Sequence, residues 1–266
     1  MAVTLRHGTH TLADGTTLDY CLHTPAAPPP QPKAALVAHP WGRLGGRKED
    51  HVVVALADTL ADEGWTVVRY DARGAGQSGG SASWTGAAEA ADYQELVDKL
   101  VLPLLLPAES SAAPPASPSA PAKPGSNDLT AQLLLCGYSF GSLAASSCPP
   151  PSPPDVTLHT SYLLVSYPLS VLWALCFLRS SPFTAALTDR LRTGTERVLA
   201  VFGDADQFSA VGKLRKWAQG LEKEAGREGC WQAVEVEGAD HFWLDREKKL
   251  RLLETVQSWL REGEAS

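Results

Sequence analysis

The sequence predicts an α/β protein with a mostly parallel, doubly wound sheet of eight strands and helices on both faces. From residue 33 onward, short apolar runs alternate with longer segments in which apolar residues recur every three or four positions. Strand–helix alternation of this length is typical of a parallel sheet. With 266 residues, 44% of them hydrophobic, the chain can bury a substantial core, and we expect a single domain over residues 1–266.

The N-terminal residues follow a different pattern. HGTHTL and TTLDYCLHT flank the short segment Ala13-Asp14-Gly15, and Asp-Gly is a dipeptide that tight hairpin turns prefer. The sequence therefore predicts an antiparallel hairpin ahead of the parallel strands.

The remaining strands and helices are expected in alternation, each bounded by a turn residue such as Gly64. The strands are predicted over residues 33–40, 65–74, 129–139, 159–168, 197–206 and 231–238. The helices are predicted over residues 49–64, 87–105, 141–148, 209–225 and 246–263.

Three segments interrupt this alternation. Residues 107–127 are rich in Pro, Ala and Ser, a composition that predicts a mobile, low-complexity loop. The proline-rich CPPPSPPD, residues 148–155, ends the helix after Ser139 early. Residues 168–196 lie between two predicted strands, where a short lid insertion fits.

The stretch 159–178 carries no charged residue and has almost the length of a membrane span. Polar residues and Pro168 interrupt it, so we expect a buried strand and an apolar lid helix instead.

Composition excludes several classes of function. The net charge of −7 and the absence of any run of basic residues argue against nucleic-acid binding. The five cysteines are scattered and form no CxxC pair, so neither a disulfide framework nor a metal site is expected. The N-terminus lacks the apolar stretch of a signal peptide. We expect a cytoplasmic protein with no cofactor and no stable membrane span.

A serine sits where a predicted strand becomes a helix. In GYSFG, Ser139 lies between Gly137 and Gly141. A nucleophilic serine on a sharp strand-to-helix turn needs small neighbours, because the turn is strained and the helix packs close to the strand. Gly-x-Ser-x-Gly also occurs by chance in unrelated chains. The preceding apolar strand and the following helix favour Ser139 as a nucleophile.

Two later loops carry an acid and a base. GDADQF follows the strand over 197–206 and contains Asp204 and Asp206, either of which has the right chemistry to orient a histidine. Asp206 is the preferred candidate, and an acidic pair that only caps the next helix is the alternative. Of seven histidines, His241 alone follows both serine and aspartate, in the order Ser, Asp, His. We expect these loops to meet Ser139 at the carboxyl edge of the sheet.

The loop HPWGRLGG, residues 39–46, follows the first parallel strand. Negative charge on a tetrahedral intermediate needs preorganised N–H donors. The N–H of Phe140, beside the nucleophile, is one candidate, and the N–H of Trp41 is the other. The glycines of this loop allow close approach of the backbone to a substrate, although they are also ordinary turn residues.

The ensemble HPWG, DARGAGQS, GYSFG, GDAD and DHFW, in this order, resembles the α/β-hydrolase superfamily over nearly the whole chain. It is most similar to a small branch with a minimal lid and a His-Pro oxyanion loop. The resemblance implies the α/β-hydrolase fold, a triad of Ser139, Asp206 and His241, and a two-donor oxyanion hole. Pro40 departs from the more usual glycine.

These observations predict a serine hydrolase that cleaves a small or apolar carboxylic ester. In the lid segment, Trp173, Phe177 and Phe183 are expected to form an apolar wall for the substrate, although a plain core helix explains them equally well. Thioesterase or peptidase activity on the same triad is an alternative, since a fold does not determine its reaction. A non-catalytic interaction protein on the same scaffold is another.

Overall fold

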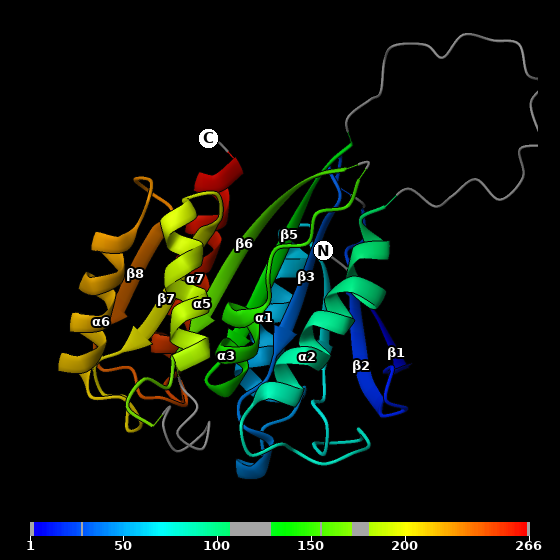
Figure 1. Ribbon diagram of the computed structural model, residues 1–266, viewed down its shortest axis with the longest axis horizontal. Coiled ribbons are helices and arrows are strands. Elements are labelled where there is room, and N and C mark those ends of the chain that lie inside the picture. The colour runs from blue at the N-terminus through cyan, green and yellow to red at the C-terminus, as the bar shows by residue number, and fades with distance from the viewer. Residues whose placement is uncertain (1–2, 28, 107–128, 155, 172–180, 265–266) are drawn as a thin grey trace, which may run out of the picture.

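A computed structural model describes residues 3–27, 29–106, 129–154, 156–171 and 181–264. One eight-stranded sheet forms its centre, in the order β1-β2-β4-β3-β5-β6-β7-β8 (Figure 1). The strands are β1 (Thr4–Thr11), β2 (Thr17–Thr24), β3 (Lys33–Ala38), β4 (Thr66–Tyr70), β5 (Leu129–Tyr138), β6 (Val156–Val165), β7 (Arg197–Gly203) and β8 (Trp231–Val236). The main helices are α1 (His51–Asp62), α2 (Ala87–Leu96), α3 (Phe140–Ser147), α5 (Ser181–Thr193), α6 (Val211–Glu224) and α7 (Arg246–Glu264).

The predicted hairpin is confirmed. Strands β1 and β2 pair in antiparallel fashion, and β2 joins β4, also antiparallel, at the edge of the parallel part of the sheet. Gly15 has a φ of 83°, which suits a turn that a side chain would strain. All remaining pairs, from β4 through β8, are parallel. The fold class predicted from the sequence is therefore correct.

Helices cover both faces of the sheet, and each face has its own apolar core. Helices α2, α3, α5 and α6 lie over one face, in front in Figure 1, and α1 and α7 lie over the other. The strands alternate between these cores, so that Leu36 faces the first and Val37 the second. Because the parallel strands are covered on both faces, they read as continuous apolar runs in the sequence.

The predicted helix over 87–105 differs from the structure. Regular α-helix ends at Leu96, and one wide π turn (Val97–Val101) and one 3-10 turn (Leu102–Leu104) follow it. Pro103 explains the change, because proline donates no N–H and its ring clashes with the carbonyl four residues earlier. The backbone responds with irregular turns in place of the α-helix.

The predicted low-complexity loop, residues 107–127, lies outside the described residues, as does the middle of the predicted lid, residues 172–180. No helix of the described residues is long and apolar enough to cross a membrane. Of the uncharged stretch 159–178, the first part belongs to β6, as expected.

Candidate active site

Ser139 occupies a strained turn between β5 and α3. Its φ is 54° and its ψ is −120°, a conformation that side chains rarely adopt. The flanking glycines are required by space. A Cβ at position 137 would lie 2.2 Å from the carbonyl oxygen of Gly141, and one at position 141 would lie 2.5 Å from the carbonyl oxygen of Ala38. The turn thus places a serine hydroxyl at the carboxyl edge of the sheet and at the N-terminus of α3.

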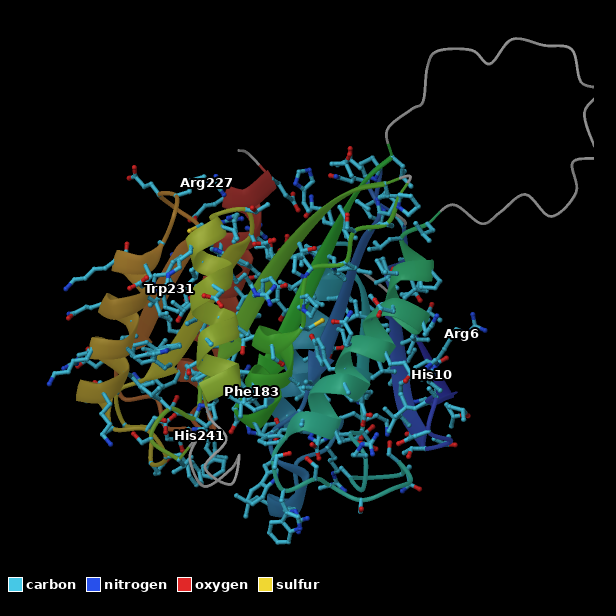
Figure 2. All side chains as sticks on the ribbon, viewed as in Figure 1. Arg6, His10, Phe183, Arg227, Trp231 and His241 are labelled. Atoms are coloured by element: carbon cyan, nitrogen blue, oxygen red, sulfur yellow. The ribbon has the colours of Figure 1, made fainter. Side chains whose placement is uncertain are left out.

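His241 lies on the loop after β8, at the lower end of the molecule in Figure 2, opposite Arg227. Its Nε2 is 2.8 Å from Ser139 Oγ, and its side chain is almost fully buried. Two contacts hold its backbone: the Tyr138 hydroxyl donates to its carbonyl at 2.8 Å, and its N–H donates to Gln207 Oε1 at 3.0 Å. The imidazole position is therefore set by β5 and by the loop after β7.

Asp206 lies on the loop after β7, and its side chain is fully buried. Its Oδ2 is 2.6 Å from His241 Nδ1, and its Oδ1 accepts the N–H groups of Phe208 and Ser209 at 2.8 Å each. Asp204 faces elsewhere and accepts the N–H of Gly238 at 2.6 Å. Geometry thus separates the two acids that the sequence left open. With Nδ1–H donating to Asp206, Nε2 is free to accept the serine proton.

The loop after β3 lines the same pocket as Ser139. In this loop, Trp41 directly precedes one 3-10 turn (Gly42–Leu44). The centroids of the Trp41 and Phe140 rings are 6.3 Å apart. A Cβ at Gly46 would lie 2.1 Å from the Pro40 carbonyl oxygen, so only glycine fits where this loop folds back. The N–H of Phe140 belongs to the first turn of α3 and has no acceptor within the helix.

His39 fixes this loop, a role that the motif did not reveal. Its Nε2 accepts the N–H of Ala72 at 2.9 Å, and its Nδ1 lies 2.5 Å from the Pro40 carbonyl. Only the neutral ring with a proton on Nδ1 satisfies both contacts. Burial lowers the pKa of His39, which keeps the ring in that neutral state.

A pocket of about 670 Å³, partly open to solvent, surrounds Ser139 and His241. Its described lining is mostly apolar and comes from the end of β5 and from the loops after β3, β6, β7 and β8. These lining residues are Pro40, Trp41, Leu44, Gly45, Gly46, Asp50, Tyr138, Pro168, Val171, Phe208 and Phe242. Most of them carry no motif of their own, and only their place in loops after the strands could have indicated them.

The three lid residues predicted to contact substrate have different outcomes. Trp173 and Phe177 lie outside the described residues. Phe183, on α5, is 5% exposed and belongs to the core over the α3 face of the sheet. A Cβ added at Gly86 would lie 3.3 Å from its ring and 3.3 Å from that of Phe140. Phe183 therefore belongs to the same core cluster as Phe140 and is absent from the described lining of the pocket.

No group of three or more potential metal ligands occurs among the described residues.

Solved structures that superpose on nearly the whole chain identify its fold. Over 98% of its length the chain superposes on 96% of a serine hydrolase without lid from Xanthomonas campestris, XC6422, with a TM-score of 0.63 and 21% sequence identity. It also superposes on the whole of Est1E from Butyrivibrio proteoclasticus, solved with ferulic acid bound, with a TM-score of 0.66 and 18% identity over 98% of the chain. The chain has the α/β-hydrolase fold.

A third structure with this α/β-hydrolase fold, an esterase domain from Rhodothermus marinus, matches 97% of the chain and 98% of its own length, at 18% identity and a TM-score of 0.60. The family model of the S15 X-Pro dipeptidyl-peptidases matches residues 14–119, less than half of the chain. That segment ends before Ser139, Asp206 and His241. No curated protein sequence matches the chain significantly.

Proposed function

We propose that this protein is a serine hydrolase that cleaves carboxylic esters through an acyl-enzyme on Ser139. One observation carries the proposal: a continuous chain of hydrogen-bonding distances runs from Ser139 Oγ to His241 Nε2, 2.8 Å, and from His241 Nδ1 to Asp206 Oδ2, 2.6 Å. A nucleophile, a base and a group that orients the base are the parts that acyl transfer needs. The three residues come from loops after β5, β8 and β7.

In the proposed reaction, Ser139 Oγ attacks the ester carbonyl while His241 Nε2 takes the hydroxyl proton. The carbonyl oxygen becomes an oxyanion, for which the N–H groups of Trp41 and Phe140 are the proposed donors. Collapse of the intermediate breaks the C–O bond, and the imidazolium returns the proton to the leaving alcohol. Water then attacks the acyl-enzyme with His241 as base, releasing the carboxylic acid and restoring Ser139.

Asp206 is proposed to hold the imidazole of His241 in the tautomer that these reaction steps require. Its carboxylate is itself held by the N–H groups of Phe208 and Ser209, and it is removed from solvent. A carboxylate fixed in this way stabilises the imidazolium as it forms, without having to reorganise.

The lining of the pocket supports a small or apolar ester as substrate. Leu44, Phe208 and Phe242 present apolar surface close to Ser139, and such walls favour apolar acyl or alkyl groups. Pro168 and Val171, at the start of the predicted lid segment 168–196, line the same pocket, and we propose a short lid there, whereas α5 at the end of the segment packs over the sheet. Trp173 and Phe177 remain proposed wall residues.

An activity-based probe tests the proposal. A fluorophosphonate should label the wild-type protein at Ser139, and Ser139→Ala should abolish the label. Ser147→Ala is the matched control, because Ser147 lies on the same helix and its hydroxyl contacts only the helix backbone, at the carbonyl of Ala144. Labelling that survives in Ser139→Ala would place the nucleophile elsewhere, and a folded wild type that takes no label would favour the non-catalytic scaffold.

The match to the S15 peptidase family model favours amide hydrolysis as a second candidate. An amide and an ester with the same acyl group separate the two reactions on one triad. An esterase should cleave the ester and leave the amide nearly untouched, whereas a peptidase should cleave both. A parallel thioester indicates whether the leaving group is restricted to oxygen.

A further inference from the structure

The pocket beside Ser139 is apolar except at one wall. Among the described residues that line it, Asp50 is the single carboxylate, and no lysine or arginine is present. Asp50 precedes α1, and its Oδ1 accepts the N–H groups of Val52 and Val53 at 2.9 and 3.5 Å. In the described part of the chain, its Oδ2 has no hydrogen-bond partner. One oxygen therefore caps the helix, while the residue also lines the pocket.

Two of the three basic side chains that closely precede Asp50 in sequence are engaged elsewhere, and the third, Arg47, is exposed and does not line the pocket. Lys48 is buried and pairs with Asp19, with Glu49 at 3.4 Å and with Asp71 at 2.9 Å. The Arg43 guanidinium lies 4.1 Å from the centre of the Trp84 ring and donates to the carbonyl of Ala82. Neither side chain lines the pocket, so the charge of Asp50 is not neutralised there by a described lining residue.

Other carboxylates add to the negative potential at this end of the molecule. Burial raises the pKa of the Tyr138 phenol, and the charges of Asp50, Asp240 and Asp206 raise it further. Tyr138 lies in the same lining as Asp50, next to the nucleophile. A molecule that enters this pocket therefore meets an apolar surface and a field that attracts positive charge.

We propose that Asp50 is a specificity residue that makes the pocket prefer esters carrying an ammonium group and disfavour esters carrying a carboxylate. This proposal rests on the esterase function proposed above. A partly buried carboxylate attracts a cation more strongly than one in open water, because the effective dielectric constant is lower. The rings of Phe208 and Phe242 suit the alkyl part of such a group and its cation–π contact.

The variant Asp50→Asn isolates the charge. Asparagine is as good an N-cap as aspartate, so α1 should keep its start while the pocket loses its carboxylate. Asp245→Asn is the matched control: Asp245 stands directly before α7 and its Oδ1 accepts the N–H groups of Glu247 and Lys248 at 2.7 and 3.2 Å, but it does not line the pocket.

Pairs of esters of equal shape and different charge provide the test. For the alcohol side, butyrylcholine is compared with the uncharged isostere 3,3-dimethylbutyl butyrate. For the acyl side, the p-nitrophenyl ester of trimethylammoniobutyric acid is compared with its tert-butyl isostere, and the p-nitrophenyl ester of succinic acid supplies the anion. In at least one pair the wild type should favour the cation by about tenfold in kcat/KM, mainly through KM.

In Asp50→Asn the ratio of kcat/KM for the charged substrate to that for the uncharged one should fall to about one. Asp245→Asn should keep the wild-type ratio. A wild type that cleaves uncharged esters with no preference for charge in either pair overturns the role of Asp50 and leaves the esterase function standing. A preference that persists in Asp50→Asn also overturns it. A wild type that cleaves no ester and takes no fluorophosphonate label overturns both proposals.

Discussion

Two buried aspartates, Asp206 and Asp71, occupy similar places and have different consequences. Each follows a strand at the carboxyl edge of the sheet, Asp206 after β7 and Asp71 after β4, and each side chain is fully buried. Each accepts two backbone N–H groups. Asp206 accepts those of Phe208 and Ser209, and Asp71 accepts those of Lys48 and Gln77, at 2.7 and 3.0 Å.

The third partner distinguishes them. Asp206 contacts the His241 imidazole, which continues to Ser139 at the pocket, whereas Asp71 pairs with the Lys48 ammonium, which continues to Asp19 and Glu49. Burial opposes the charge of Asp71, but the N–H groups of Lys48 and Gln77 and the ammonium hold its pKa below the ordinary value. Burial and pairing alone therefore do not distinguish the proposed catalytic carboxylate from a structural one. The difference lies in whether the network reaches a reactive group at an open pocket.

The largest expected effect is at the end of the first network. Ser139→Ala should lower kcat for an ester by about 10⁶-fold, because the covalent step is lost. The melting temperature should not fall, since alanine keeps the packing at this buried position and leaves no hydroxyl that needs a hydrogen-bond partner. Steady-state kinetics and thermal denaturation of the same preparation check both parts. A residual rate near that of the wild type would place the nucleophile elsewhere.

A smaller loss is expected at Asp206. Asp206→Asn should lower kcat by about 10⁴-fold, because an amide donor facing Nδ1 selects the wrong tautomer of His241. Asp204→Asn is the control, since the hydrogen bond that Asp204 makes is with the N–H of Gly238, on the loop after β8, and not with His241. Its rate should stay within about threefold of the wild type. Equal losses in the two variants would contradict the assignment of the acid.

A substitution in the second network, around Asp71, should lower the free energy of unfolding and leave kcat nearly unchanged. Asp71→Asn leaves the buried Lys48 ammonium with fewer partners, and we expect the free energy of unfolding to fall by about 3 kcal/mol. Urea denaturation measures this loss, and kcat well below the melting temperature should change by no more than about threefold. If kcat falls 100-fold or more while stability is kept, the contrast between the two aspartates does not hold.

The smallest effect concerns pH and His39. Burial lowers the pKa of His39 in the folded protein below the ordinary value of 6.5, so the unfolded chain binds more protons between these two values. The free energy of unfolding should therefore fall as the pH drops below 6.5, by at most about 1.4 kcal/mol per pH unit, and level off below the folded pKa.

The variant His39→Gln should flatten this dependence between pH 7 and pH 5, as measured by urea denaturation at a series of pH values. It should not abolish it, because His23 is also buried with a lowered pKa, owing to desolvation and the charge of Arg69. An unchanged slope in His39→Gln would show that His39 is not the group that titrates.

Much of the fold follows from local chemistry, and the sequence alone predicted it. The turn at Asp14-Gly15 and the apolar runs of β3 through β8 follow from backbone preference and burial on two faces, which leave a periodic signal. The setting of Ser139 was also predictable, because glycines at 137 and 141 are needed wherever a helix packs so close to its strand. Pro103 was also visible in the sequence, but the end of the α-helix at Leu96, within the helix predicted over residues 87–105, was not anticipated.

The tertiary structure decided what depends on contacts between distant segments. Asp204 and Asp206 are only two positions apart in the sequence. The packing of the loops after β7 and β8 orients Asp206, and not Asp204, toward His241. Asp50 falls within the helix predicted over residues 49–64, and Phe183 falls within the predicted lid. The folded chain places the first in the pocket lining and the second in the core. Which side of a loop residue faces a cavity is set by neighbours far along the chain, and short-range periodicity carries no record of them.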